Sequence, residues 1–112
     1  MSNAKEFYAQ IGEKMQKMQK DAPAMTTGFG TLFSKVMKDG AISLREKELI
    51  ALGIAVAVNC PPCIRAHVRK CLESGASKEQ ILEAASVAVV MGGGPAYMHV
   101  LEVIDALDAL GK

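Results

Sequence analysis

The chain has 112 residues, enough for one domain, because two separate cores of half that length would each be marginal. Half of the residues are apolar and only 4% are aromatic, a composition that favours helices over strands. With 13 basic and 12 acidic side chains the formal net charge is +1, so no overall field attracts nucleic acid or an anionic membrane. We therefore expect one all-α domain over residues 1–112, with no nucleic-acid partner.

Apolar residues are also more abundant than so small a domain can bury, which predicts a homo-oligomer. A membrane span is not expected, because prolines or glycines interrupt both long uncharged stretches, residues 49–64 and 84–101. The chain begins with a polar helical pattern rather than a signal peptide, so we expect a cytoplasmic protein. Residues 1–4 are given no structural role.

The first element is an amphipathic helix that starts near Phe7 and stops before Pro23. Its apolar positions are spaced by four, four and three residues, and lysines alternate with them on the other side. Residues 21–30 are rich in Pro, Thr and Gly and predict a loop. A short second helix follows over residues 32–37 and ends at Asp39-Gly40.

Two capping boxes mark the starts of later helices. Ser43 with Glu46 begins a third helix that is nearly all apolar from Leu49 to Val58, and Ser77 with Gln80 begins a fifth that reaches residue 91. Between them a fourth helix runs from about Cys60, at its N-cap, to residue 73. The run Gly-Gly-Gly-Pro at residues 92–95 breaks the chain before a sixth helix over 96–110. The prediction is a compact bundle of about six helices.

The most informative stretch is Cys60-Pro-Pro-Cys63-Ile-Arg-Ala-His67 at the start of the fourth helix. At about 100° per residue, Cys60, Cys63, His67 and Cys71 fall within an arc of about 80°. In a cytoplasmic chain, two cysteines this close indicate redox chemistry or a metal site before a structural crosslink.

A metal site can be tested by distance. Cys71 follows Cys63 by eight residues, ~12 Å along a helix, which is too far for both to bind one tetrahedral zinc ion. Zinc bound by Cys60, Cys63, His67 and an outside ligand remains an alternative. Attachment of a c-type haem is excluded, because Ile64 stands where the histidine would be needed. Cys71 is expected to be a buried packing residue.

Redox chemistry fits the spacing best. A thiol near a helix N-terminus has a lowered pKa, because the helix dipole and unpaired N–H groups stabilise the thiolate. His67 lies one turn after Cys63 and leans back toward it, so Cys63 is the thiol with a base. Cys60 is the partner that can close a disulfide or receive electrons from an external dithiol. Two packed cysteines and a core histidine are the structural alternative.

Glu48 is the candidate to orient His67. A helical hairpin that turns near Asn59 brings this carboxylate within about one turn of the level of the imidazole. There it would fix the tautomer and raise the basicity of the ring. On spacing alone, a solvated acid in the first turn of its helix is an equal alternative.

Taken together, the pattern resembles the AhpD-like alkylhydroperoxidase and carboxymuconolactone decarboxylase superfamily. It consists of Glu48, eleven residues, Cys60-x-x-Cys63-x-x-x-His67, a Ser77 capping box and the Gly92–Pro95 break, and it covers roughly residues 39–110. The resemblance implies an all-helical fold in trimers or hexamers, with the hexamer favoured for so short a chain. It also implies that Cys63 attacks a peroxide, that Cys60 resolves the product as a disulfide, and that His67 and Glu48 relay protons.

The expected function is therefore a thiol peroxidase that reduces a hydroperoxide with electrons from an external dithiol or disulfide reductase. No metal, flavin or haem is needed as a cofactor. The chain departs from well-known peroxidase members at Pro62, where they carry a histidine, so a relay through that histidine cannot operate here. Alternatives are a thiol-disulfide oxidoreductase in which Cys60, expected to be the exposed cysteine, attacks first; lactone decarboxylation, although that branch generally lacks the cysteine pair; and a non-catalytic oligomer that senses metal or redox state.

Overall fold

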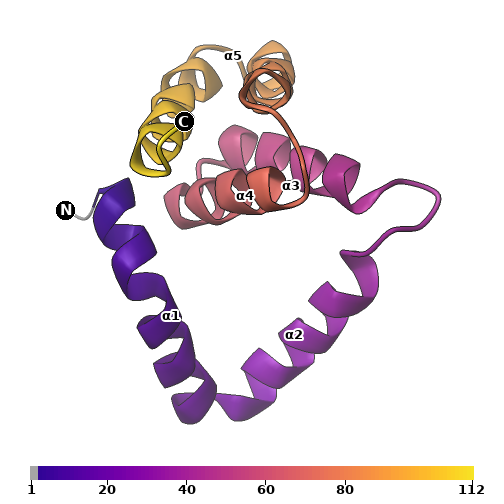
Figure 1. The fold of residues 1–112 in the computed structure, drawn as a ribbon, viewed down its shortest axis with the longest axis vertical. Helices are drawn as coiled ribbons and strands as arrows, with labels where there is room; N and C mark the ends of the chain where they lie inside the picture. The colour runs from indigo at the N-terminus through magenta and orange to yellow at the C-terminus, as the bar shows by residue number, and fades with distance from the viewer. Residues whose placement is uncertain (1–2) are drawn as a thin grey trace.

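A computed structural model describes residues 3–112, and within that range the chain contains helices and no strand. Figure 1 shows how the helices are arranged. Their bounds are α1 Ala4–Asp21, α2 Pro23–Val36, α3 Leu44–Val58, α4 Pro61–Glu73 and α5 Lys78–Ala109. The predicted all-α class is confirmed, with five helices in the described part of the chain instead of about six.

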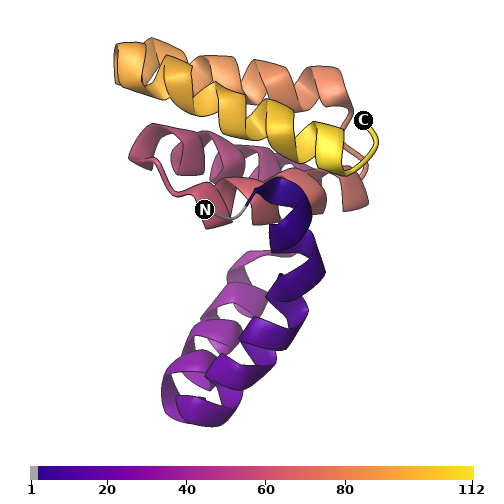
Figure 2. The ribbon, with the colours of Figure 1, turned by 90° about the vertical axis from the view of Figure 1, so that its left-hand side faces the viewer.

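Helices α3, α4 and α5 form the helical core. The two halves of α5 lie side by side on one face of α3 and α4, as Figure 2 shows. Both predicted capping boxes are present, Ser43 with Glu46 on α3 and Ser77 with Gln80 on α5. The largest fully buried side chains all come from these three helices: Leu52, Val56, Ile64, Val68, Cys71, Ile81, Val103 and Leu107.

The predicted break at residues 92–95 is a sharp kink within α5. Gly93 has φ 70° and ψ −153°, a backbone conformation that only glycine adopts readily, so the helix turns back at this residue. The fifth and sixth predicted helices are therefore the two halves of α5.

Among the described residues, α5 is long and apolar enough to cross a membrane, by length and composition alone. Its fold argues against crossing, because each half is shorter than the ~20 residues that a span needs.

Helices α1 and α2 form the arm, which has the shape of a V in Figure 1 and projects from the core in Figure 2. The predicted loop over residues 21–30 is wrong, since α2 already begins at Pro23. Proline is suited to the first helical turn, where its missing N–H is not needed, and the Thr26 hydroxyl donates to the Ala22 carbonyl at 2.8 Å. Phe29 and Phe33, one turn apart, then place their ring centroids 6.0 Å from each other.

The N-terminal end of the arm is fixed to the core. Asn3 caps α1 by accepting a hydrogen bond from the Glu6 N–H, and Ala4 is buried. The Tyr8 hydroxyl donates to the Arg65 carbonyl of α4 at 2.6 Å. The prediction that residues 1–4 have no structural role is thus wrong for Asn3 and Ala4, because a cap and a buried contact tie them down. Met1 and Ser2 lie outside the described residues.

Candidate redox site

The turn between α3 and α4 positions the two cysteines. Asn59 ends α3 in the left-handed conformation, with φ 56°, and the Cys60 N–H then donates to the Ala55 carbonyl at 3.1 Å. Cys60 is the N-cap of α4, as predicted, and Pro61 and Pro62 occupy its first turn. The turn therefore fixes Cys60 and Cys63 at the positive end of the α4 dipole.

Cys60 and Cys63 form a disulfide, with their Cα atoms 5.2 Å apart. The Cys63 N–H donates to the Cys60 Sγ at 3.3 Å. Cys63 is exposed, whereas Cys60 is half-buried. The expectation that Cys60 is the more exposed cysteine is wrong, because the N-cap folds back against the end of α3 while Cys63 lies on the outer side of the first turn.

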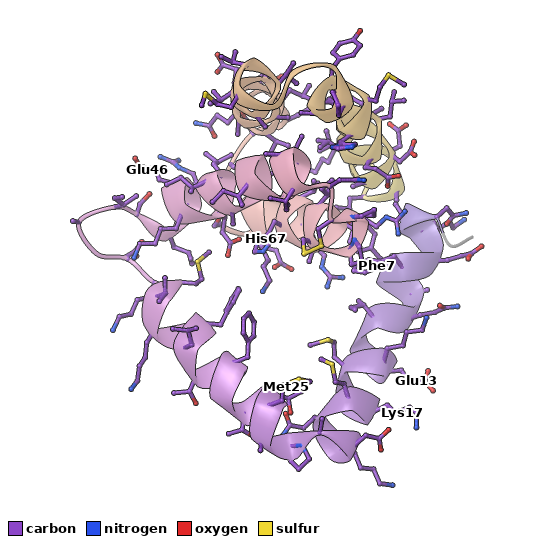
Figure 3. All side chains as sticks on the ribbon, turned by 180° about the vertical axis from the view of Figure 1, so that it is seen from behind. Phe7, Glu13, Lys17, Met25, Glu46 and His67 are labelled. Atoms are coloured by element: carbon purple, nitrogen blue, oxygen red, sulfur yellow. A yellow bond between two sulfur atoms is a disulfide. The ribbon has the colours of Figure 1, made fainter. Side chains whose placement is uncertain are left out.

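His67 and Glu48 form a close pair across α4 and α3. The His67 Nδ1 and the Glu48 Oε1 are 2.7 Å apart, and the Glu48 side chain is only 5% exposed. An ionised Glu48 accepts from Nδ1–H, which leaves the lone pair of His67 on Nε2. Glu48 is therefore not a solvated acid, and the site contains a carboxylate–imidazole pair one turn from Cys63. Figure 3 labels His67.

The sequence did not single out two further residues at this site. Phe33 of α2 stacks on the His67 ring, with centroids 6.3 Å apart and planes 27° apart. The Lys70 ammonium lies over the same Phe33 ring, 5.1 Å from its centroid. Because these contacts depend on how the arm meets α4, no local sequence signal identifies them.

Cys71 and His99 stand apart from the redox chemistry. Cys71 is a free, fully buried cysteine, as predicted. Burial, and secondarily the charge of Glu48, raises the pKa of its thiol to about 12. His99 Nδ1 lies 2.8 Å from the Val56 carbonyl, a contact between α5 and α3. Among residues 3–112, no group of three His, Cys, Asp or Glu side chains is placed to hold a metal ion.

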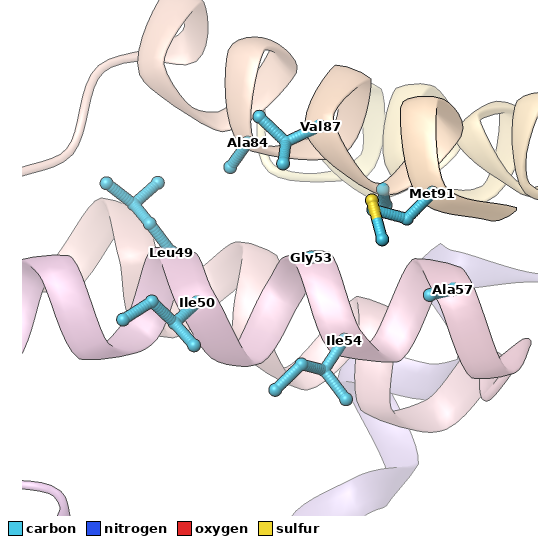
Figure 4. Close-up of a pocket in the computed structure, with 9 residues that line it drawn as sticks. Leu49, Ile50, Gly53, Ile54, Ala57, Ala84, Val87 and Met91 are labelled. Carbon is cyan, nitrogen blue, oxygen red and sulfur yellow. The ribbon is translucent and has the colours of Figure 1, made fainter.

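Two apolar hollows border the molecule. The arm hollow, of about 500 Å³, lies between α1 and α2 and ends at Phe33 and Lys70; its other lining residues are Met15, Met18, Gln19, Met25, Thr26, Phe29 and Gly30. The core groove, of about 460 Å³, lies between α3 and the first half of α5 (Figure 4). It is lined by Leu49, Ile50, Gly53, Ile54, Ala57, Ala84, Val87, Ala88 and Met91. Of these two, the arm hollow adjoins the site through Phe33, and a smaller pocket of about 230 Å³ beside it reaches both Phe33 and Glu48.

A helical core with a Cys-x-x-Cys disulfide at a helix N-terminus and a buried Glu–His pair defines a small dithiol protein. The model of the carboxymuconolactone decarboxylase family matches residues 23–106, and the chain belongs to that family. The predicted family resemblance is thereby confirmed.

Solved structures agree over nearly the whole chain. A carboxymuconolactone decarboxylase family protein from Legionella pneumophila shares 37% identity, with a TM-score of 0.89 and 97% of each chain covered. One from Thermotoga maritima, suggested to take part in an antioxidative response, shares 29% identity with a TM-score of 0.82, over 93% of this chain and 89% of that one. Among curated proteins, an uncharacterized protein of the cox locus of Paracoccus denitrificans is 42% identical over 82 residues, 73% of this chain and 74% of the relative.

Proposed function

We propose that this protein is a thiol peroxidase that reduces hydroperoxides by cycling the Cys60–Cys63 pair between dithiol and disulfide. The observation that carries the proposal is the position of this disulfide, at the N-terminus of α4 and one turn from the His67–Glu48 pair. Such a position favours a thiolate on reduction, and the thiolate is the nucleophile of cysteine chemistry.

Peroxide reduction starts from the dithiol. His67 Nε2 takes the proton of the Cys63 thiol, and Glu48 stabilises the imidazolium through Nδ1–H. The Cys63 thiolate attacks one oxygen of the hydroperoxide, the O–O bond breaks, and the alkoxide leaves with the proton from His67 as an alcohol. Cys63 is then a sulfenic acid. The Cys60 thiol condenses with it, releasing water and forming the disulfide.

An external dithiol or disulfide reductase restores the two thiols. Its thiolate attacks the exposed Cys63 Sγ, the S–S bond breaks, and Cys60 leaves as a thiolate. The Cys63 N–H, 3.3 Å from the Cys60 Sγ, stabilises this leaving group. The second thiol of the donor then releases Cys63 and becomes oxidised. The cycle consumes one hydroperoxide and one dithiol, and it uses no metal, flavin or haem.

The relay in this proposal has a single imidazole. Pro62 occupies the position before Cys63, so no side chain there can carry a proton. His67 must serve both as the base for Cys63 and as the acid for the leaving alkoxide. We therefore place the whole proton transfer on His67, with Glu48 as its positioning partner.

A second candidate function is thiol-disulfide exchange with a disulfide substrate. It is favoured by the exposure of Cys63, because a disulfide can reach this thiolate from solvent. In that case Cys63, not Cys60, would attack first.

We also propose that the protein is cytoplasmic and forms a homo-oligomer, a hexamer ahead of a trimer. Large apolar side chains are exposed on both the arm and α5, and they favour association of subunits.

The deciding experiment measures hydroperoxide consumption with a dithiol donor. Cys63→Ser is expected to abolish turnover, and Cys60→Ser to stop it after one oxidation of Cys63. Cys71→Ala is the matched control and should keep turnover, since that thiol is buried away from the pair. Turnover in Cys63→Ser at the wild-type rate would contradict the proposal, and faster reaction with a small disulfide than with any hydroperoxide would favour the second candidate.

A further inference from the structure

The imidazole of His67 is fixed at one ring atom by its contact with Glu48. The Glu48 Oε1 lies 2.7 Å from Nδ1, and this hydrogen bond sets the position of that atom. It does not set the plane of the ring, because the ring can rotate about the N–H···O line and the terminal torsion of a histidine has broad minima. Since proton transfer needs Nε2 to point at the Cys63 thiol, the plane of the ring must be held as well.

Phe33 of α2 lies against the face of that ring. The two ring centroids are 6.3 Å apart and the planes differ by 27°, which is within the range of stacked aromatic pairs. Figure 3 shows His67 on the side of α4 that faces the arm. A ring against the imidazole face opposes the rotation that the bond to Glu48 leaves open. The two contacts come from different helices, and together they determine where Nε2 points.

The Phe33 ring is itself held from several sides. The Lys70 ammonium of α4 lies 5.1 Å from its centroid, a cation–π contact, and the centroid of the Phe29 ring lies 6.0 Å away. The C-terminal end of α2 is bound to α3, because the Lys47 Nζ donates to the Val36 carbonyl at 2.9 Å. Phe33 is half-buried, whereas most residues of α2 are exposed. A largely solvated helix is thus placed against the site through this side chain.

We propose that Phe33 is a positioning residue of the redox site, which acts through His67 to direct Nε2 at the Cys63 thiol. The inference rests on the proposed function, in which His67 takes the proton of Cys63. Phe33 carries no proton and no electron in that scheme, so its removal should slow the activation of Cys63 without abolishing it. The arm then contributes to thiolate formation through one aromatic ring.

The test measures the rate at which iodoacetamide alkylates Cys63 in the reduced protein at neutral pH, with the labelled cysteine identified by mass spectrometry. Phe33→Leu keeps an apolar side chain but removes the aromatic face, and it should slow alkylation several-fold. Phe33→Tyr keeps the ring and should react like the wild type. Phe29→Leu is the matched control, the same change one turn earlier in a side chain that is 64% exposed, and should also react like the wild type.

A second comparison asks whether the effect passes through His67. Phe33→Leu is made in the His67→Asn background, where a residue that acts only by orienting the imidazole has nothing left to orient. We expect no further slowing there. Equal slowing in both backgrounds would overturn the proposal. Alkylation of Phe33→Leu at the wild-type rate, or a loss in Phe29→Leu as large as in Phe33→Leu, would overturn it too.

Nuclear magnetic resonance reports the orientation of the ring itself. The chain has two histidines, so the His67 ring is observed beside His99 as an internal reference. In Phe33→Leu, carbon relaxation of the His67 ring should show larger motion, while His99, whose Nδ1 contacts the Val56 carbonyl, should stay unchanged. Unchanged motion of the His67 ring would contradict the proposal.

Failure of this inference and failure of the proposed function give different results. Alkylation uses no peroxide, so the comparison stands even if the protein reduces no hydroperoxide. If His67→Asn alone leaves alkylation at the wild-type rate, the proton step of the proposed function is wrong and the inference falls with it. If His67→Asn slows alkylation and Phe33→Leu does not, only the inference is wrong.

Should Phe33→Leu not fold, Lys47→Met takes its place. This change keeps the Phe33 ring but removes the hydrogen bond that holds the end of α2. We expect slower alkylation of Cys63 in Lys47→Met, and no further slowing when it is combined with His67→Asn. Alkylation at the wild-type rate would overturn the proposal.

Discussion

The helical core and the arm are made of the same kinds of residues but are stabilised differently. In the core, large side chains of α3, α4 and α5 are fully buried; in the arm, Ala4 is the only buried residue in the described part of α1 and α2. The core positions every residue that we place in the redox cycle. The arm meets the Glu48–His67 pair through the stacking of Phe33 on His67. The chemistry is thus built on the well-buried part of the chain, and the arm borders it at Phe33.

The largest expected effect is on the rate of the redox step. His67→Asn should lower the rate of hydroperoxide reduction about 10²–10⁴-fold, because it removes the base that activates Cys63. Glu48→Gln should cause a smaller loss, since the imidazole remains but its tautomer is no longer held. Stopped-flow kinetics of the reduced protein measure both. His99→Asn is the matched control, and an equal loss there would mean that the effect is structural.

The next prediction compares the free energy of unfolding after the same Leu→Ala substitution in the core and in the arm. Leu52→Ala should lower the free energy of unfolding by about 2–5 kcal/mol, because Leu52 is fully buried and the cavity cannot collapse completely. Leu32→Ala, at 58% exposure, should cost much less in the unfolding of the monomer. Urea titration at a concentration where both variants are monomeric measures the difference. Equal losses would show that the arm is packed as tightly as the core.

A smaller effect is expected at the kink of α5. Gly93→Ala should destabilise the protein by about 1–3 kcal/mol, because an alanine is strained at φ 70° and ψ −153°. The neighbouring Gly94→Ala is the control, because its Cβ would meet no atom within 4 Å and its φ is not in the left-handed region. That change should be neutral, or stabilise by about 0.4–1 kcal/mol by restricting the unfolded chain. Thermal unfolding of the two variants measures the difference in stability. Similar melting temperatures would contradict the strained backbone conformation at Gly93.

The smallest effect is a loss of stability at high pH. The pKa of Cys71 is raised to about 12, so the folded protein keeps this proton above pH 9 while the unfolded chain releases it. The unfolded state then binds fewer protons, and stability falls as pH rises from about 9 toward 12, by at most about 1.4 kcal/mol per pH unit for this one group. Cys71→Ala should lack this part of the slope. Urea midpoints that fall equally steeply in both proteins would argue against a buried thiol.

The sequence predicted the core well because its signals are local. Capping boxes at Ser43 and Ser77, and the glycine-rich break before Pro95, mark where helices start and turn whatever packs around them. The spacing of Cys60, Cys63 and His67 places them on one helical face for the same reason. Glu48 needed one further assumption, a hairpin that turns near Asn59, and the structure does place it against His67.

The prediction failed where tertiary contacts, not local sequence signals, determine the structure. Gly28 and Gly30 indicated a loop, but both lie in α2, whose apolar side chains line a hollow with α1. The exposure of the two cysteines depends on how the turn after Asn59 folds back on α3, which the spacing does not reveal. Phe33 reaches His67 only because of the angle at which the arm meets α4. These features join segments far apart in the sequence, so no periodicity reports them.

The central claim, that the Cys60–Cys63 pair reduces a hydroperoxide, is tested most directly by a single turnover. The fully reduced protein is mixed with one equivalent of an organic hydroperoxide, and thiols and alcohol are counted by mass spectrometry. The account predicts one alcohol formed and one Cys60–Cys63 disulfide closed, with Cys71 still a thiol. Unoxidised Cys60 and Cys63 after the peroxide has been consumed, or a peroxide that survives intact beside the dithiol, would contradict it.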